Sequence, residues 1–473
     1  MNRFLLMLGC LVLSSCIQMG PDFVRPKAPE GSHFELNSNN QSIPADWWTL
    51  FHCQALNQMV QEGLQNNYSL ASMRAALISA KEYANAEQGL LLYPSADATL
   101  AQTRQRFSPQ AFGFPGQPVI FNLTNINVAV SYNMDLFGAN HRQIESLMSQ
   151  TEVQRYQMVA AQVTLASNIA TTAISWSSLQ EQVTDQENIV QQEQALLRSV
   201  QVRVDAGSQP RSDLAIQSAN LAQQQANLAQ LKRVKKQMQH QLEIYLGRFP
   251  GQKPLQSFSL SDLTIPQDVP ISLPSEWVHQ RPDILVSESR LHVASANLGY
   301  AMANVYPSLS LSAGLGSEAL TPGSLFSPVS NVWNIGGGLT QPLFRGGALQ
   351  AAKRSAEAAL DQARQDYLQT VVQAFGNVAD VLTALNEDQT ALMAQQLASD
   401  SAATVLSDTH VRYQAGSVSL PVLLTADEQA RKTSLLYAQA KATRLNDVVA
   451  LYLAMGGGWW NQKSTAQQPK TEK

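Results

Sequence analysis

The stretch NINVAVSYNMDL, at residues 125–136, alternates polar and apolar side chains without interruption. Its apolar positions are Ile126, Val128, Val130, Tyr132, Met134 and Leu136. This period of two predicts a β-strand with one apolar and one polar face. A strand in a soluble protein averages about 5–6 residues, whereas a strand that crosses a membrane needs about 9–11. The length and the alternation therefore predict a strand of a membrane-spanning β-barrel, with apolar side chains outward and polar side chains inward.

Three further stretches are expected to extend this sheet. Residues 95–107 weakly resemble a strand, and residues 108–121, with their Pro and Gly, are expected to form the loop that follows. Residues 309–316 and 333–340 alternate in the second half of the chain, and a polar loop at 317–330 joins them. Four strands cannot close a barrel, which takes about eight, and open edges in lipid would leave backbone groups without hydrogen bonds. The sequence therefore predicts that several chains assemble.

Long helices are predicted after each pair of strands. Residues 139–206 contain neither Pro nor Gly, and one helix of this length would span roughly 100 Å at 1.5 Å per residue. Apolar residues recur at a step of seven in this helix and the next: Val159, Ala166 and Ala173, then Leu214, Leu221 and Leu228, then Leu231, Met238 and Tyr245. Such heptads predict helices that supercoil against their neighbours. Residues 347–414 and 420–455 repeat this pair of a long and a shorter helix.

Three pairs of matching segments indicate that one structural unit is used twice. They are RVDAGS at 203–208 with RYQAGS at 412–417, YPS at 93–95 with YPS at 306–308, and DLFG at 135–138 with PLFRG at 342–346. Each copy ends its long helix at a glycine, Gly207 or Gly416, which is the residue that a helix C-terminus favours. These glycines are therefore predicted to form the turns of two helical hairpins, far from the strands.

The repeat fixes the expected domain layout. The layout is a signal peptide at 1–15, an extended N-terminal segment at 16–53, a first repeat at 54–250, a linker rich in Pro at 251–274, a second repeat at 275–456, and a C-terminal tail at 457–473. Each repeat comprises a helix, a strand pair and a long helical hairpin, and the first helix is expected to cover residues 54–92.

The N-terminus has the features of a bacterial lipoprotein signal. Arg3 precedes a short apolar stretch, Phe4–Leu13, which is too short to span a bilayer. Leu13-Ser14-Ser15-Cys16 then resembles a lipobox. In a lipobox the chain is cleaved before the Cys, so that Cys16 would become the mature N-terminus and carry fatty acids such as palmitate. Several acyl chains form a firm membrane anchor. The alternative is an ordinary signal peptide with a chance Cys. The residue after Cys16 is Ile17 and not the Asp that is associated with retention in the inner membrane, so the protein is expected in the outer membrane.

Composition and motifs argue against several other functions. The net charge of -4 and the absence of a basic stripe predict no nucleic-acid partner. GxSxG, HExxH, CxxC and phosphate-loop motifs are absent, and the seven His are scattered. No enzymatic activity, catalytic residue, cofactor or metal site is therefore predicted. Cys53, the third Cys beside Cys10 and Cys16, is expected to be a small buried apolar residue.

A set of short motifs, in order along the chain, carries a family resemblance. The motifs are the lipobox, GPDFVRP at 20–26, DWW at 46–48, DLFG at 135–138, RPDI at 281–284, YPS at 306–308 and GGGW at 456–459. Each motif is weak alone, but together they span nearly the whole mature chain. The chain resembles the TolC-like outer-membrane efflux ducts, of the lipid-anchored subfamily that includes OprM-like and NodT-like proteins.

The resemblance implies an α+β membrane protein that acts as a homotrimer. Three chains with four strands each would form a twelve-stranded outer-membrane β-barrel, continuous with a long periplasmic α-helical barrel. Its partners would be a periplasmic adaptor (membrane fusion) protein, an inner-membrane pump of the RND, MFS or ABC type, and outer-membrane lipid. The duct would conduct drugs, dyes or toxic compounds and contribute to antibiotic resistance. Two alternatives are a type I protein secretion duct and a non-conducting outer-membrane lipoprotein scaffold.

The resemblance also implies a gate near the hairpin turns. Asp213 and Tyr413 match two residues of the family's periplasmic latch, and Arg412 is a nearby cation; the alternative is that all three are solvated surface residues. Family members place an acidic residue after the second hairpin, but the aligned positions here are Val422 and Thr425. Asp427 lies two residues further on, so an acidic constriction ring is in doubt. The residues around Gly207 and Gly416 are the expected adaptor contact.

Overall fold

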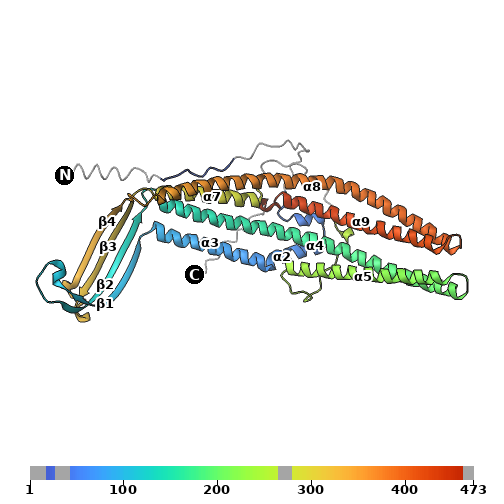
Figure 1. Cartoon of the computed structure of the whole chain (residues 1–473), viewed down its shortest axis with the longest axis horizontal. Coiled ribbons are helices and arrows are strands. Elements are labelled where there is room, and N and C mark those ends of the chain that lie inside the picture. The colour runs from blue at the N-terminus through green and yellow to red at the C-terminus, as the bar shows by residue number, and fades with distance from the viewer. Residues whose placement is uncertain (1–17, 27–42, 265–279, 462–473) are drawn as a thin grey trace. The chain divides into compact units, whose positions relative to one another are not determined.

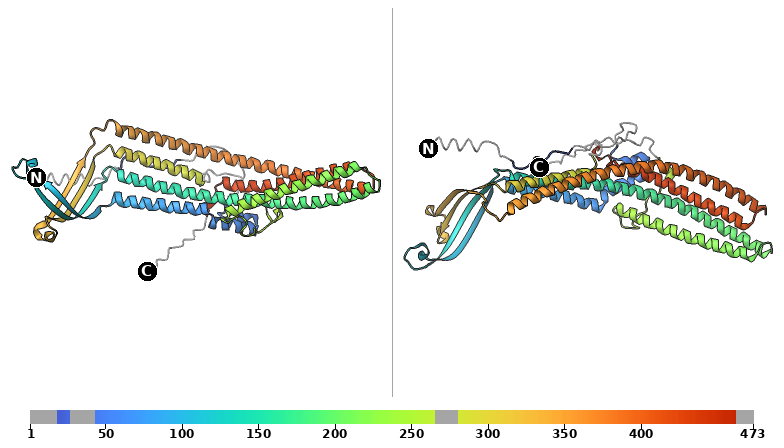
Figure 2. Two further views of the ribbon diagram at one scale, coloured as in Figure 1. Left: turned by 60° about the horizontal axis from the view of Figure 1, so that its bottom comes forward. Right: turned by 45° about the horizontal axis from the view of Figure 1, so that its top comes forward.

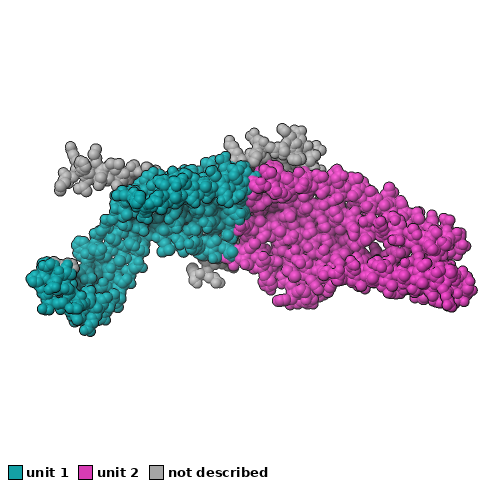
Figure 3. Space-filling model, in the orientation of Figure 1, with its two compact units in different colours: residues 1–27, 76–155, 286–368 teal, residues 28–75, 156–285, 369–473 magenta. Residues whose placement is uncertain are grey.

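The computed structural model describes residues 18–26, 43–264 and 280–461. It divides into two compact units, which Figure 3 shows in teal and magenta. Unit 1 comprises Met1–Lys27, Ala76–Arg155 and Val286–Leu368, and unit 2 comprises Ala28–Ala75, Tyr156–Leu285 and Gln369–Lys473. The expected signal peptide and Cys16 lie outside the described residues, as do parts of the expected linker and tail.

The main helices and strands are labelled in Figure 1. In chain order they are α2 (Gln54–Asn66), α3 (Tyr68–Leu92), β1 (Ser95–Phe107), β2 (Val119–Met134), α4 (Ala139–Asp205), α5 (Arg211–Tyr245), α7 (Pro282–Ala303), β3 (Ser308–Ala319), β4 (Asn331–Thr340), α8 (Ala348–Gln414) and α9 (Leu420–Ala454). Helices α4 and α8 are each 67 residues long, and α5 and α9 are each 35. The predicted two-fold repeat is therefore confirmed. None of the described helices is both long and apolar enough to cross a membrane.

The strands form one antiparallel sheet in the order β1-β2-β3-β4. Strand β2 begins earlier than predicted, because Val119 pairs with Phe107 and the ladder continues without a break from there. The residues from Val119 to Phe121 were expected to belong to a loop, and this expectation is wrong. Strand β3 likewise continues to Ala319, where the sequence predicted a loop from 317. Backbone pairing, which the local composition does not reveal, sets both boundaries.

The register gathers the alternating apolar residues on one face of the sheet. Val128 of β2 pairs with Ala98 of β1 and with Leu315 of β3, and Leu315 pairs with Trp333 of β4. The other face carries mainly Ser, Thr, Asn and Gly. The apolar face is exposed in the single chain, with Leu315 at 67% and Trp333 at 74%. Exposed apolar surface of this extent marks a face that contacts lipid or another protein.

In unit 1, the helices that adjoin the strands follow the order of the strands. Figure 2 shows α3, α4, α7 and α8 side by side in that sequence. The side-chain amide of Asn140 in α4 donates to the carbonyl oxygen of Leu91 in α3 at 2.9 Å. The ring of Phe137, after β2, stacks on that of Tyr306, before β3, with centroids 4.8 Å apart. The ends of the first and second strand pairs are thus held together.

The single helix predicted for residues 54–92 is divided at Asn67. This residue has extended backbone (φ -65°, ψ 123°), and its side-chain oxygen accepts from the N–H of Leu70 at 3.1 Å. Its side-chain nitrogen donates to the carbonyl oxygen of Tyr245 at 3.0 Å. Asn67 therefore caps the start of α3 and ties it to the end of α5. The expectation of one helix was wrong because Asn offers the backbone an alternative hydrogen bond.

The core of unit 2 packs aromatic residues against the small faces of the long helices. Trp47 is 1% exposed and stacks on Tyr452 of α9, with ring centroids 5.3 Å apart. Residues of the predicted heptads in α4 are buried, as expected: Val159, Ala166 and Ala173. Cys53 is buried and free, which confirms the expectation for it. Small residues on α4 let its neighbours approach closely, as heptad packing requires.

Helix α9 ends at two of the predicted motifs, which are the segment around Arg281 and the three glycines Gly456–Gly458. The guanidinium of Arg281 donates to the carbonyl oxygen of Ala454, and its other nitrogens bond Asp283 at 2.7 and 3.1 Å. All three glycines have positive φ. A Cβ on Gly457 would lie 2.6 Å from a side-chain carbon of Val163, so only glycine fits there. The Arg thus satisfies a helix end that would otherwise have an unpaired carbonyl.

Val130→Arg tests the assignment of the apolar face. We expect a lower yield of membrane-inserted protein, because an Arg that faces lipid costs about 2–4 kcal/mol at the bilayer midplane. Ala129→Arg is the matched control, since its side chain lies on the polar face and pairs with Asp97 of β1. Yields are measured in isolated outer membranes. Equal yields from the two variants would contradict the assignment.

Candidate functional site

The two helical hairpins of unit 2 end in turns of the same geometry. In the first turn, the N–H of Ser208 donates to Arg203 at 2.8 Å, and that of Gly207 donates to Val204 at 2.9 Å. The second turn repeats both bonds around Gly416 at 2.9 and 3.0 Å. Both glycines have φ of +71°, a left-handed conformation that favours glycine. This is the Schellman end of a helix, so both predicted hairpin turns are present.

A small apolar cluster lies next to these turns and includes one predicted latch residue. The buried members are Val200, Tyr413, Leu420 and Leu423. The guanidinium carbon of Arg203, on α4, lies 4.9 Å from the centre of the Tyr413 ring on α8. This cation–π contact links the first hairpin to the second. The Tyr413 hydroxyl is buried and has no hydrogen-bond partner in the described part of the chain.

Farther along the hairpins, a polar cluster joins three helices. Glu193 of α4 is 3% exposed and accepts from Arg431 of α9 at 2.9 Å. The side chain of the fully buried Gln217, on α5, donates to the same carboxylate. Arg431 also pairs with Asp427, one turn before it on α9. We call Glu193, Gln217, Asp427 and Arg431 the hairpin clasp, because they connect the α4–α5 hairpin with α9.

The hairpin clasp contains two carboxylates but one guanidinium. Burial raises the pKa of Asp427 to about 6; Arg431 opposes this shift, whereas the negative charge and hydrogen bond of Glu193 add to it. A single cation therefore serves both acidic groups in a poorly solvated place. Because an unpaired buried charge is costly, the ionised form of Asp427 is disfavoured there.

The other predicted site residues lie apart from the clasp. Asp213, in the first turn of α5, is half-buried, and its carboxylate makes no hydrogen bond or ion pair within the described residues. The Arg412 side chain is exposed. Val422 is 49% exposed, and the exposed Thr425 donates its hydroxyl to the carbonyl oxygen of Pro421 at 2.9 Å. Within one chain, the structure does not bring Asp213 to Tyr413.

Sequence reasoning missed Glu193, Gln217 and Arg431. The one local signal was the i, i+4 spacing of Asp427 and Arg431, which suits a helical ion pair. Glu193 and Gln217 stand among many Glu and Gln residues on helices that are mostly polar. Only the packing of α4 against α5 and α9 distinguishes the buried pair from those on the surface.

The fold and its hairpins are those of a known family. The family model "Outer membrane efflux protein" matches residues 59–248 and 273–457. The chain therefore belongs to the outer membrane efflux protein family, and it is an outer-membrane channel component of an efflux system. The resemblance to TolC-like ducts is confirmed.

Individual relatives agree with this assignment. The chain is 28% identical over 457 residues to the pyoverdine export outer membrane protein OpmQ of Pseudomonas putida, covering 95% of this chain and 96% of the relative. It is also 28% identical to the cation efflux system protein CusC of Escherichia coli, covering 95% of this chain and 97% of that protein. The solved structure of the CmeC outer membrane channel of Campylobacter jejuni has the same fold, with a TM-score of 0.87 at 23% identity, over 93% of this chain and 95% of that one.

Arg431→Met tests whether the hairpin clasp stabilises the helices. We expect a loss of about 3 kcal/mol in the free energy of unfolding, because the substitution leaves the buried carboxylate of Glu193 without its cation. Lys232→Met is the control: Lys232 pairs with Glu187 at 2.6 Å across α4 and α5, but both side chains are about half exposed. Such a surface pair contributes only about 0–1 kcal/mol. The stability of each variant is measured in detergent by the thermal loss of its helical circular dichroism. Equal losses of stability in Arg431→Met and Lys232→Met would contradict a stabilising role of the hairpin clasp.

The raised pKa of Asp427 also predicts a dependence of stability on pH. An acid whose pKa is about 6 in the folded chain and 3.8 when unfolded binds its proton more tightly in the folded state. Its unfavourable contribution is therefore fully present above pH 6 and is relieved as the pH falls toward 4. We expect the melting temperature of the wild type to rise more than that of Asp427→Asn when the pH is lowered from 7 to 5. Equal changes in the melting temperatures of the two proteins would show that Asp427 ionises normally.

Proposed function

We propose that three copies of this chain form the outer-membrane duct of a tripartite efflux pump for small molecules. The observation that carries the proposal is the sheet. Both edge strands, β1 and β4, are exposed along their whole length, and the described residues provide no strand that pairs with their outer edges. In a membrane these edges must find partners. Three sheets of four strands make a closed barrel of twelve, within the range of outer-membrane barrels.

The length of the helices is evidence for partners in the periplasm. Helices of 67 residues can span roughly 100 Å at 1.5 Å per residue. We propose that the turns at Gly207 and Gly416 contact a periplasmic adaptor, which connects the duct to an inner-membrane pump of the RND, MFS or ABC type. The names of the relatives mention pyoverdine export and cation efflux, two different cargos. We therefore assign to the duct a broad class of small compounds, including drugs, dyes and toxic compounds.

Two finer assignments complete the proposal. Cys16 is the lipidated N-terminus of the mature protein. Tyr413, Asp213 and Arg412 form the latch that closes the duct, with the bonds made between neighbouring protomers. Asp213 supports this, because its half-buried carboxylate makes no hydrogen bond or ion pair within the described residues of one chain and is open to a partner. A double variant, Asp213→Ala with Tyr413→Phe, should conduct more in planar bilayers; unchanged conductance would remove these residues from the latch.

Dye accumulation in a deletion strain tests the duct itself. We expect the strain to retain more of a fluorescent dye, and to be more sensitive to an antibiotic panel, than the same strain with the chain restored. The reason is that a pump without its exit duct cannot pass cargo across the outer membrane. The empty vector and a chain with Val130→Arg are the controls. No difference between the deletion and restored strains would argue for protein secretion or for a scaffold, and secreted-protein profiles would then separate these two.

A further inference from the structure

Two arginines lie close together near the end of the sheet that is remote from the helices. Arg104 and Arg106, near the last residue of β1, Phe107, are the only Lys or Arg in residues 95–134 and 308–340, which hold the four strands and the loops within each pair. Both side chains are exposed, and neither guanidinium makes a hydrogen bond or ion pair within the described residues. The contacts of the single chain therefore give this pair no role.

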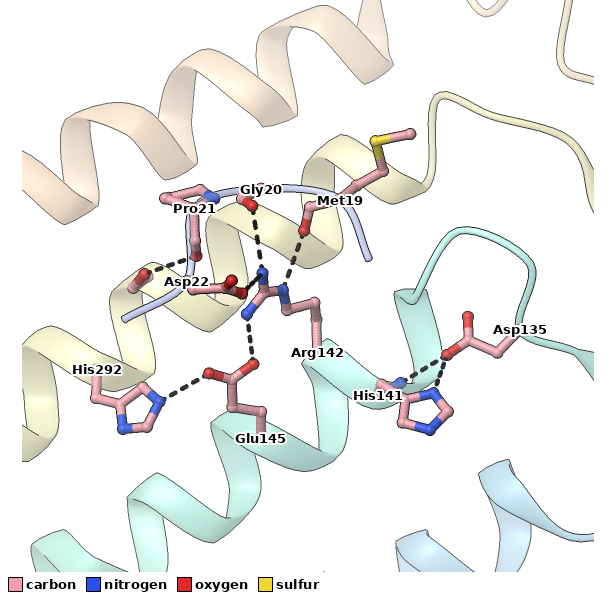
Figure 4. A network of polar contacts seen from close by, with 10 residues as sticks. Met19, Gly20, Pro21, Asp22, Asp135, His141, Arg142, Glu145 and His292 are labelled. Atoms are coloured by element: carbon pink, nitrogen blue, oxygen red, sulfur yellow. Dashed lines mark hydrogen bonds and ion pairs between the residues drawn. The ribbon is translucent and has the colours of Figure 1, made fainter. Parts of the chain in front are cut away.

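Arg142 provides a comparison within the same unit. It lies at the start of α4, is 2% exposed, and pairs with the carboxylates of Asp22 at 2.9 Å and Glu145 at 2.7 Å (Figure 4). Such a buried, paired guanidinium serves the fold itself. Arg104 and Arg106 differ from it in both respects, because they are exposed and have no carboxylate partner. They are therefore candidates for binding a group outside the chain.

The register places both arginines on the face of the sheet that carries the alternating apolar residues. Successive side chains of a strand point to opposite faces, so Arg104 and Arg106 share a face with Ala98. Ala98 pairs with Val128, which belongs to the apolar face of β2. The two arginines are separated by roughly 7 Å along the strand. They therefore project together from the lipid-facing side of the proposed barrel.

The apolar part of this face ends before the arginines begin. On β2 it extends from Met134 to Ile126, which pairs with Leu100 of β1. This segment spans roughly 27 Å along the strand, or roughly 21 Å across the membrane at a tilt of about 40°, which is near the ~25 Å apolar band of outer-membrane barrels. Arg104 lies roughly 14 Å beyond Leu100 along the strand. Because long Arg side chains can reach back toward a membrane, both guanidinium groups are expected at the level of the lipid headgroups.

The sheet supplies no acidic residue that could neutralise the pair. The acidic residues of its four strands and of the loops from β1 to β2 and from β3 to β4 are Asp97 and Glu318. Asp97 pairs with Ala129 and Glu318 pairs with Asn125, so both acids belong to the polar face. In the proposed trimer, β1 pairs with β4 of the next copy, and β4 contains no charged residue. An anion that binds the two arginines must therefore come from outside the sheet.

We propose that Arg104 and Arg106 bind the phosphate groups of an anionic lipid in the outer leaflet of the outer membrane. The inference rests on the proposed trimeric barrel, in which the helices extend into the periplasm and the opposite end of the sheet faces the exterior. A guanidinium can bind a phosphate through two parallel hydrogen bonds, and basic residues at headgroup level attract anionic lipids. Each copy contributes one pair of arginines on its edge strand β1, so each site lies beside the seam between two copies.

Retention of lipid A by the purified full-length protein tests the site, with native mass spectrometry as the measurement. The two probes are lipid A that carries both of its phosphates and lipid A from which the phosphates have been removed. We expect the wild type to retain severalfold more of the phosphorylated probe, and the double variant Arg104→Gln with Arg106→Gln to lose this preference. Arg104→Lys with Arg106→Lys should retain more phosphorylated lipid than the Gln variant, because it keeps both positive charges.

The matched control is Arg354→Gln with Arg364→Gln, which removes two exposed arginines from helix α8 and should keep the wild-type preference. An unchanged preference in the Gln variant of Arg104 and Arg106 would overturn the inference. Equal losses in the Gln and Lys variants would also overturn it, because they would indicate a disturbed strand and not a lost charge. The same spectra report the mass of the assembly. A monomeric wild type would therefore count against the proposed duct, and with it against this site, whereas a trimeric Gln variant that retains the lipid would count against this site alone.

Discussion

Hydrogen bonding at the two open edges of the sheet is the constraint on which the rest of the structure depends. Exposure to water is unfavourable for the apolar face of the sheet, which includes Trp333 and Leu315, and exposure to lipid is unfavourable for the unpaired backbone groups of β1 and β4. A single chain is therefore unstable in either environment. Closure with the sheets of other copies satisfies both, because it pairs every edge and leaves the apolar face to the lipid. Since helices follow directly from the strand pairs, a closed ring of strands also requires the helices of several chains to come together.

The long helices meet a different requirement, which is to pack closely while remaining in water. Ala166 and Ala173 on α4 are almost completely buried, and the flanks of the same helix are rich in Gln and Asn. Such narrow seams of small residues bury little apolar area, so each contributes modestly to stability. Specific polar contacts between helices, such as those of Glu193 with Gln217 and Arg431, then matter more than they would in a globular core.

The architecture could be predicted from the sequence because its signals are periodic and local. Alternation at 125–136, the heptads of α4 and the two hairpin glycines each reflect a backbone geometry that recurs over many residues. What could not be predicted depends on partners that are distant in the sequence. Asn67 divides a helix because it bonds Leu70 and Tyr245, and β2 starts at Val119 because β1 lies opposite. Glu193 of the hairpin clasp likewise bonds Gln217 and Arg431, each more than twenty positions away, and no local pattern marks these contacts.

The composition of the hairpin clasp determines how firmly it holds the helices together. The family resemblance predicts an acidic residue near Val422 and Thr425, and in this chain the nearby acid is Asp427, which is paired with Arg431. Two carboxylates around one guanidinium leave an excess negative charge in a poorly solvated site, so the link is weaker than apolar packing of similar volume would be. A weak link is a disadvantage for a rigid tube, but hairpins that must separate for cargo to pass need contacts that can be broken at modest cost. The carboxylate of Asp427 thus belongs to a contact between helices, through Arg431 and Glu193.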